Sequence, residues 1–447
     1  MHTGGDIIYT HTTSYAVEIC DNKSSMRNLM NKYRSAVEYL IPVVDSLWNN
    51  IAAISGILYK QKFVEEKIHS TRNHTAVYDF DTVFHKFPSY LRRSAIREAV
   101  GIVSSYKTQL EQWIESGCCG TEPKLVYKHF ACPALYKGDM FKWNDDGTAS
   151  IKVFRNNDWQ WVRAKLKRTD LKYLEKRKRV NTSCEVFSPV LEKRPKGKWF
   201  LRFTLKEKVT FEDKPVEERR VCAVDLGVNT DATCSVIDVH GTVLSRKFIN
   251  RGREKDSVDN ALRRVSAFQR EHGSHDSGRL WNLAKRRNLN LAHQIAHDIV
   301  EHAREQGCDV IVFEYLDMKG RKHGRKQKLA MWKHQDIQST AESLAHKYGM
   351  RISRVSAKNT SKYAYDGSGT IKRGKQVSKD TPYDVCRFTT GKMYNCDLSA
   401  SYNIGARYFI RELYKEKADA MAEVPGIGSG TRRVMADLWL INATLGL

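Results

Sequence analysis

Three acidic residues next to apolar segments are the strongest candidates for chemistry in this chain. Asp225 lies in VCAVDLGVN, Glu314 in DVIVFEYL and Asp397 in YNCDLSASYN, with separations of 89 and 83 residues. Each carboxylate taken alone also fits a cap or a hydrogen-bonded polar residue at the end of a strand. Together they fit a site for two Mg²⁺ ions about 4 Å apart, which need several carboxylate oxygens delivered by rigid, buried strands.

The sequence around these acids predicts α/β elements that bring them together. An apolar run such as DVIVFE is typical of a strand buried on both faces of a sheet, and apolar residues at every third or fourth position predict helices. Strands are expected at Val221–Asp225, Ala232–Val239, Val243–Ile249, Asp309–Glu314 and Arg351–Val355. Helices are expected around the stripe Leu289, Ala292, Ala296, Ile299 and Ala303, over Trp332–Tyr348, and directly after Asp397.

The N-terminal half has a different composition. A strand is expected at Thr12–Cys20, followed by helices over Ser24–His69, kinked at Pro42, and over Ser89–Glu115. From Lys124 to Asp213, short runs rich in β-branched and aromatic residues alternate with Gly, Asn and Asp turns. This alternation predicts a small antiparallel β domain.

The chain carries a large positive charge. Its 447 residues include 75 Lys and Arg against 51 Asp and Glu, a formal charge of +24. Residues 151–208 alone hold 18 basic and 6 acidic residues, a net +12, with Trp and Phe residues among them. Such a surplus indicates a polyanionic partner, and cations beside aromatic rings are typical of nucleic-acid-binding surfaces. The densest run, Lys172–Arg179, is by itself also typical of a solvated loop.

Neither a membrane span nor a disulfide framework is expected. The most apolar stretch, Tyr39–Tyr59, is interrupted by a proline and polar residues, and the N-terminus lacks the features of a secretory signal, so the protein is expected in the cytoplasm. The ten cysteines are scattered without a CxxC pair, which predicts reduced thiols and argues against a four-thiolate zinc site.

The three acidic segments resemble, in the same order, the split RuvC motifs of the TnpB family and of the compact type V CRISPR effector nucleases. The first motif, Asp-x-Gly-x-Asn, matches Asp225, Gly227 and Asn229, and the second matches Glu314 with Leu316 two places on. The third, roughly D-x-N-A-A-x-N-I-x-x-R, matches with two small or polar positions changed, at Asp397, Ser399, Ala400, Ser401, Asn403, Ile404 and Arg407. The resemblance covers the C-terminal half well and is thin before residue 120.

The sequence departs from this family between the second and third motifs. The family carries a four-cysteine zinc ribbon there, introduced by Thr-Ser-x-x-Cys-x-x-Cys. In this chain Ala364 and Gly367 stand at the first two cysteine positions, and only Cys386 lies near the second pair. Zinc is therefore not expected, and aromatic residues are expected to hold the module together in its place, namely Tyr363, Tyr365, Tyr383 and Phe388.

The resemblance implies a fold of α/β and β parts: an RNase H-like (RuvC) nuclease domain, an oligonucleotide-binding β-barrel wedge domain and a helical recognition lobe. The wedge would comprise residues 1–23 as its first strand and residues 121–215 as its basic barrel, with the recognition lobe at 24–120. The nuclease domain would comprise residues 216–355, with motifs I and II, and 397–447, with motif III and the tail. A degenerate, zinc-ribbon-like insert that binds target nucleic acid would occupy 356–396.

The same resemblance implies an RNA-guided DNA endonuclease. Asp225, Glu314 and Asp397 would hold two Mg²⁺ for phosphodiester hydrolysis, while guide-RNA pairing and a short flanking motif select the target DNA. The protein would act as a monomer or homodimer on one RNA of CRISPR or transposon origin, in a prokaryote and at the nucleoid when bound to DNA. The residues expected to contact nucleic acid are Lys165, Lys167, Arg168, Lys176, Arg177, Lys178, Arg179, Lys285, Arg286, Arg287 and Arg407.

Two other functions stay open at the level of sequence. A guide-independent, structure-specific RNase H-like nuclease or resolvase would need the same carboxylates, although it would not need the large basic β domain. A nuclease-dead module that only binds nucleic acid would not need the intact set of Asp225, Glu314 and Asp397.

Overall fold

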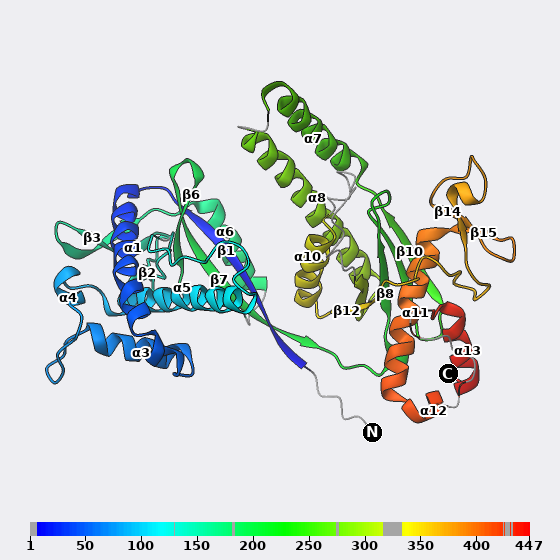
Figure 1. Ribbon diagram of the computed structural model, residues 1–447, viewed down its shortest axis with the longest axis horizontal. Coiled ribbons are helices and arrows are strands. Elements are labelled where there is room, and N and C mark those ends of the chain that lie inside the picture. The colour runs from blue at the N-terminus through cyan, green and yellow to red at the C-terminus, as the bar shows by residue number, and fades with distance from the viewer. Residues whose placement is uncertain are drawn as a thin grey trace. The chain divides into compact units, whose positions relative to one another are not determined.

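A computed structural model describes residues 7–128, 130–180, 184–273, 277–315, 333–422, 424, 430 and 432–447, without the side chains of 177–180 and 422. The chain divides into two compact units (Figure 1). One comprises Thr12–Lys208, and the other comprises Met1–His11 with Val209–Leu447. Among the described helices, none is long and apolar enough to cross a membrane.

The first half of the Thr12–Lys208 unit is mostly helical. They are α1 (Lys23–Ser46), α2 (Trp48–Ala52), α3 (Ile57–Ile68), α4 (Phe80–Val83) and α5 (Ser89–Glu115). The helical region expected over Ser24–His69 consists of three helices, because the chain breaks at Leu47 and again before α3, where Gly56 has a φ of 84°. Helix α1 continues through Pro42 for a further turn, since the missing N–H costs one hydrogen bond while the apolar face on both sides stays buried.

The β part of this unit consists of two sheets. One is β2 (Phe141–Trp143), β3 (Ala149–Arg155) and β4 (Asp158–Ala164); the other has β1 (Ile7–Ile19), β7 (Lys198–Phe211) and β5 (Glu185–Val186) in order, with β6 (Val190–Arg194) also paired to β7. Strand β3 pairs antiparallel with β2 and β4, and β7 pairs antiparallel with β5 and β6. The basic run Lys172–Arg179 is not a loop, since it belongs to helix α6 (Arg168–Val180).

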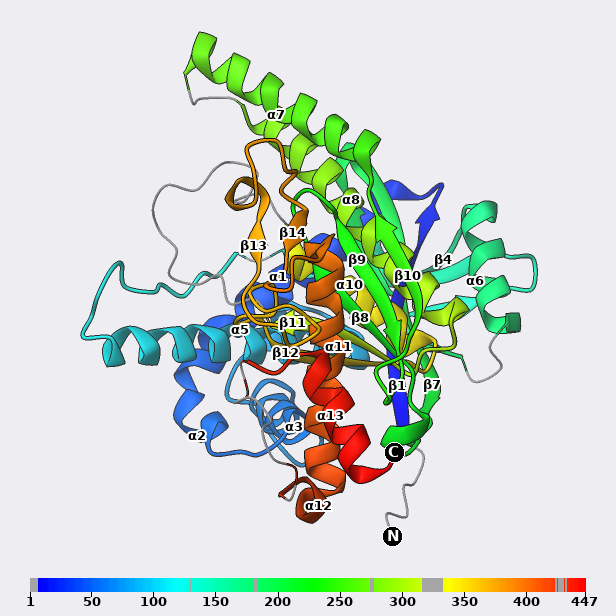
Figure 2. The ribbon, with the colours of Figure 1, turned by 90° about the vertical axis from the view of Figure 1, so that its right-hand side faces the viewer.

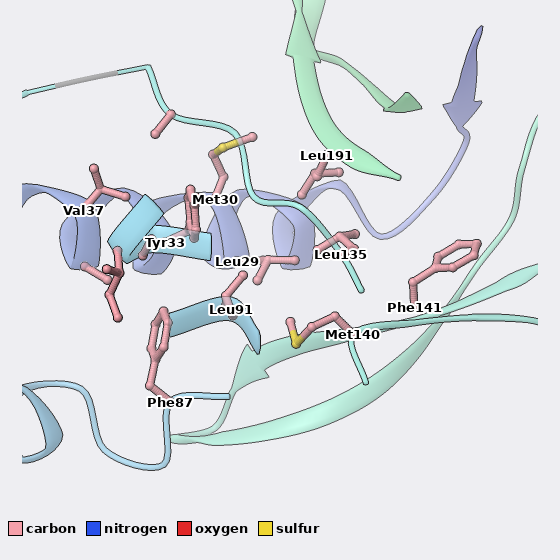
Figure 3. Close-up of a cluster of buried hydrophobic side chains, with 14 of the residues drawn as sticks. Leu29, Met30, Tyr33, Val37, Phe87, Leu91, Leu135, Met140, Phe141 and Leu191 are labelled. Carbon is pink, nitrogen blue, oxygen red and sulfur yellow. The ribbon is translucent and has the colours of Figure 1, made fainter. Parts of the chain in front are cut away.

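One apolar core joins the helices and the strands of this unit. Side chains of α1 and α5 pack with residues from the β part, as Figure 3 shows. The buried residues labelled there are Leu29, Met30, Tyr33, Val37, Phe87, Leu91, Leu135, Met140, Phe141 and Leu191. Burial of this kind contributes about 1.5–3 kcal/mol for each large side chain, so the helices and the β part stabilise each other.

A five-stranded mixed sheet is the centre of the second unit. Its order is β10 (Val243–Ile249), β9 (Ala232–Ile237), β8 (Val221–Leu226), β11 (Val310–Tyr315) and β12 (Arg351–Ser356). Strands β8, β9 and β10 pair antiparallel, whereas β8, β11 and β12 run parallel. All five strands lie within one or two residues of the ranges expected from sequence.

Helices cover both faces of this sheet. Successive side chains of a strand point to opposite faces, and here the side chains on both faces are apolar. Cys222 and Val224 point to a core with α7 (Gly252–His272), α8 (Gly278–Glu305) and α10 (His334–Lys347). Val221 and Ala223 point to a core with α11 (Cys396–Glu416) and α13 (Met435–Leu445), on the face seen in Figure 2. The short α12 (Ala418–Ala422) follows α11.

A small three-stranded sheet lies between β12 and α11 in sequence. It contains β13 (Lys372–Arg373), β14 (Val385–Arg387) and β15 (Met393–Asn395), all antiparallel. Its buried core is Ala364, Cys386, Phe388 and Cys396, with Tyr365, Ile371 and Tyr394 packed against it. Tyr365 and Phe388 thus support the module as expected, whereas Tyr383 is exposed and Tyr363 lies outside this core.

Candidate active site

Two of the three acidic residues lie side by side on neighbouring parallel strands. The β8–β11 register pairs Val221 with Val310 and runs to Val224 with Phe313, so Asp225 and Glu314 are the next residues on each strand. Both follow the alternation of the side chains that face α11. The carboxyl ends of two buried strands therefore present two carboxylates at one edge of the sheet.

The third acidic residue is brought to this edge by α11. Asp397 lies in the first turn of the helix, whose N-terminus is capped by Asn395 through its side-chain oxygen, at 3.0 Å from the backbone N–H groups of both Asp397 and Leu398. The helix packs closely on the sheet, because a Cβ at Gly405 would come within 2.7 Å of Ile237 Cδ1. A hydrogen bond of 2.5 Å between the hydroxyls of Ser235 and Ser401 fixes the same contact.

Burial and neighbouring charges shift the pKa of all three carboxylates. Desolvation, followed by the charges of Glu314 and Asp397, raises the pKa of Asp225 well above its usual range. Desolvation also raises the pKa of Glu314, opposed by the hydroxyl of Thr360 and the charge of Arg407, and it raises the pKa of Asp397, opposed by Arg373. A buried carboxylate whose charged form is opposed by two neighbouring acids is typical of a functional site.

The donor atoms fit a hard divalent cation. Glu314 Oε1 is buried and has no hydrogen-bond partner in the described part of the chain, so one ligand oxygen is unused by the protein. Among the described residues, however, no three His, Cys, Asp or Glu side chains converge closely enough to hold an ion. The oxygens are suitable and neighbouring, but the conformation of the set is not that of a metal-bound site.

One residue of the site was not predicted from sequence. Arg373, on β13, donates a hydrogen bond from Nη2 to Asp397 Oδ1 at 2.8 Å. In the sequence it belongs to a glycine- and lysine-rich stretch, GTIKRGK, that has the composition of a surface loop. Only the pairing of β13 with β14 and of β14 with β15, which leads directly into α11, brings this arginine to the acidic residues.

Arg407, expected to contact nucleic acid, has a structural position instead. It is 5% exposed, and its Nη1 donates to the carbonyl oxygens of Ser356 at 2.7 Å and Lys358 at 2.9 Å. Burial lowers its pKa, and the charge of Glu314 opposes that shift. This guanidinium fixes the chain that follows β12 and does not face solvent, and whether it contacts nucleic acid stays a prediction.

The other predicted nucleic-acid contacts are on two basic segments. Lys165, Lys167, Arg168 and Lys176 are exposed on or just before α6, and the side chains of Arg177, Lys178 and Arg179 lie outside the described residues. On α8, Lys285 and Arg286 are exposed and Arg287 is half-buried, donating from Nη1 to the carbonyl of Ser257 at 2.9 Å. Nothing in these positions tests whether they contact nucleic acid.

Comparison with known proteins finds similarity to a family model and to TnpB-like proteins. Residues 11–155 match the Aq_aa04 family. A TnpB-like protein of Aquifex aeolicus (strain VF5), aq_aa05, is 27% identical over 229 residues, covering 46% of this chain and 72% of that protein. The TnpB-like protein ORF457 of Acidianus two-tailed virus is 26% identical over 200 residues, covering 41% of each chain.

A solved structure shares the fold. The Cas12f1 protein, solved by cryo-electron microscopy with a single guide RNA and target DNA, superposes with a TM-score of 0.50 over 94% of this chain and 82% of its own, at 13% identity. The chain therefore shares the overall fold of that protein, with mixed helices and sheets. The resemblance of this chain to the TnpB family and the compact type V CRISPR effectors, predicted from its three acidic motifs, is confirmed.

Proposed function

We propose that this protein is an RNA-guided DNA endonuclease that cuts with Asp225, Glu314 and Asp397. The observation that carries the proposal is the placement of Asp225 and Glu314 on adjacent parallel strands, under a helix whose first turn holds Asp397. Three carboxylates from distant parts of the chain are a costly arrangement for stability alone, since burial raises the pKa of each of them.

These three residues would hold divalent metal, with Mg²⁺ matching their oxygen donors. Metal bound there would supply activation of the attacking water and stabilisation of the leaving oxygen of the phosphodiester. The protein's part is positional. The β8–β11 register fixes the spacing of Asp225 and Glu314, and the Ser235–Ser401 bond holds α11, and with it Asp397, against the sheet.

The Thr12–Lys208 unit would hold the guide. We assign its β part, with β1, to an oligonucleotide-binding wedge, and α1 to α5 to a recognition lobe inserted between β1 and the rest. The sheet that pairs β1 with β7 supports this assignment, because it joins the start of the unit to its end. The exposed cations of α6 would contact the RNA backbone, and guide–target pairing would carry the sequence specificity.

The RNA that co-purifies with the protein tests this function. We expect a single abundant species with a variable 3′ end, and we expect the complex to cut DNA complementary to that end in the presence of Mg²⁺. A matched control is DNA with the same composition and a scrambled target. Bulk cellular RNA, or equal cleavage of both DNAs, would instead favour a guide-independent, structure-specific nuclease. Matched binding without cleavage would favour a nuclease-dead binding module.

A further inference from the structure

Arg373 is held in place on the third acidic residue by three contacts. Besides the 2.8 Å bond to Asp397 Oδ1, its Nε donates to the carbonyl of Tyr383 at 2.9 Å. The guanidinium also lies over the Tyr383 ring, 4.5 Å from its centre. Contacts at Nε, at Nη2 and on the flat face together leave the guanidinium one orientation, directed at Asp397.

This ion pair and a metal ion would compete for the same oxygen. The side chains of Arg373 and Asp397 are 25% and 17% exposed, so water screens their attraction only in part. A divalent cation would draw on the negative charge of Asp397, which the guanidinium already neutralises in part through its bond to Oδ1. Both cannot act fully on Oδ1 at once.

We propose that Arg373 is a latch that withholds Asp397 from metal until a DNA strand offers the guanidinium another partner. This inference rests on the proposed function, since it assigns Asp397 to a metal site. A phosphodiester is the chemical class that would release the latch, because a guanidinium binds phosphate oxygens as readily as carboxylate oxygens. Two further exposed cations, Lys372 on β13 and Lys375 directly after it, would attract a strand to the same place.

The latch explains how the site can be complete in residues and yet not arranged for metal. Asp397 carries a cationic partner in direct contact, whereas Glu314 Oε1 has no hydrogen-bond partner in the described part of the chain. A nuclease that carries nucleic acid permanently would cut wrong strands if its metal site were always formed. Tying metal binding to the arrival of a substrate phosphate prevents that.

Metal binding by the full-length protein, freed of nucleic acid, tests the latch without any activity assay. Mn²⁺ serves as the probe, and its binding is followed by electron paramagnetic resonance during a titration. Each protein is also made with Asp397→Asn, and the binding that remains in that version is subtracted to leave the binding that depends on Asp397. We expect Arg373→Gln to bind Mn²⁺ about tenfold more tightly than wild type, within the range found when residues next to metal ligands are changed. Arg387→Gln, which removes the same charge from the same sheet without touching Asp397, should bind as wild type.

Two results would overturn the latch, and they are distinguishable. Equal or weaker binding by Arg373→Gln would reject the latch and leave the proposed metal site intact. No Asp397-dependent binding in any protein would reject the metal site itself. Arg373→Lys is a second variant that keeps the charge but cannot make all three contacts, so it should bind Mn²⁺ with intermediate affinity.

Discussion

Asp225 lies near the end of a buried strand, close to two other acidic side chains. Burial and the charges of these neighbours disfavour its ionised form. In the unfolded chain an aspartate has a pKa of about 4, whereas in the folded protein desolvation and the charges of Glu314 and Asp397 raise it. Above that lower pKa the unfolded chain releases its proton first. The free energy of unfolding therefore falls as the pH rises, and it stops falling once the pH has passed the raised pKa of the folded state.

The first prediction follows from this linkage. Asp225→Asn keeps the shape of the side chain and removes the charge, so in metal-free buffer its melting temperature should exceed that of wild type at neutral and alkaline pH. The difference should shrink as the pH falls toward about 4, where both states of wild type become protonated. Thermal unfolding with a chelator present measures it. A variant that melts lower than wild type at every pH would contradict the pKa assignment.

At this scale the sequence indicates the acidic residues of the candidate site more clearly than the basic residues around them. The three carboxylates could be found because each follows or precedes an apolar segment and matches an ordered motif. Arg407 matches the same motif, but the sequence does not show that carbonyl groups of Ser356 and Lys358 surround it. Arg373 could not be found, since its proximity to Asp397 depends on the pairing of two-residue and three-residue strands, for which the sequence pattern is too short.

The element that positions Asp397 is α11, and it approaches the sheet closely at Gly405. A Cβ there would come within 2.7 Å of Ile237 Cδ1 and 3.3 Å of the Ala223 Cβ. We therefore predict that Gly405→Val destabilises the protein by about 1–3 kcal/mol, as is typical when a packed core is overfilled. It should also slow cleavage, because the first turn of α11 moves with the helix.

A glycine within another helix provides the control. Gly101 lies inside α5, and a Cβ there would meet no atom within 4 Å. Gly101→Val should change stability by no more than about 0.5 kcal/mol. Denaturant unfolding of both variants measures the comparison. Equal losses at the two positions would mean that helix propensity, and not close packing on the sheet, decides the effect.

The elements of the sheet were predictable for a physical reason. Strands β8, β9 and β11 are largely buried, so they appear in the sequence as apolar runs. Gly307, which has a positive φ, marks the turn that follows α8. Helix α6 was not predicted, because its strongly charged sequence also fits a solvated loop. The short strands of the insert have too few residues to show an alternation.

For the whole molecule, the charge of +24 predicts RNA binding that depends strongly on salt. Lys285 and Arg286 are exposed on α8 and are proposed phosphate contacts. Replacing either by alanine should weaken binding of the co-purifying RNA and lower the slope of log Kd against log salt by about 1. Lys415→Ala, which removes an exposed cation that pairs with Glu412 on α11, is the matched control and should leave the slope unchanged. Identical slopes for all variants would exclude the α8 contacts.

The rate of target cleavage by Asp225→Asn protein tests the central claim most directly. Wild type and variant are loaded with the same co-purifying RNA and given the same complementary DNA in Mg²⁺, with binding measured alongside. The account predicts equal RNA and DNA binding and a loss of cleavage of at least about 100-fold, more than the loss found when only the surroundings of a metal ligand are changed. Cleavage by Asp225→Asn at the wild-type rate would contradict it, because Asp225 would then hold no part of the active site.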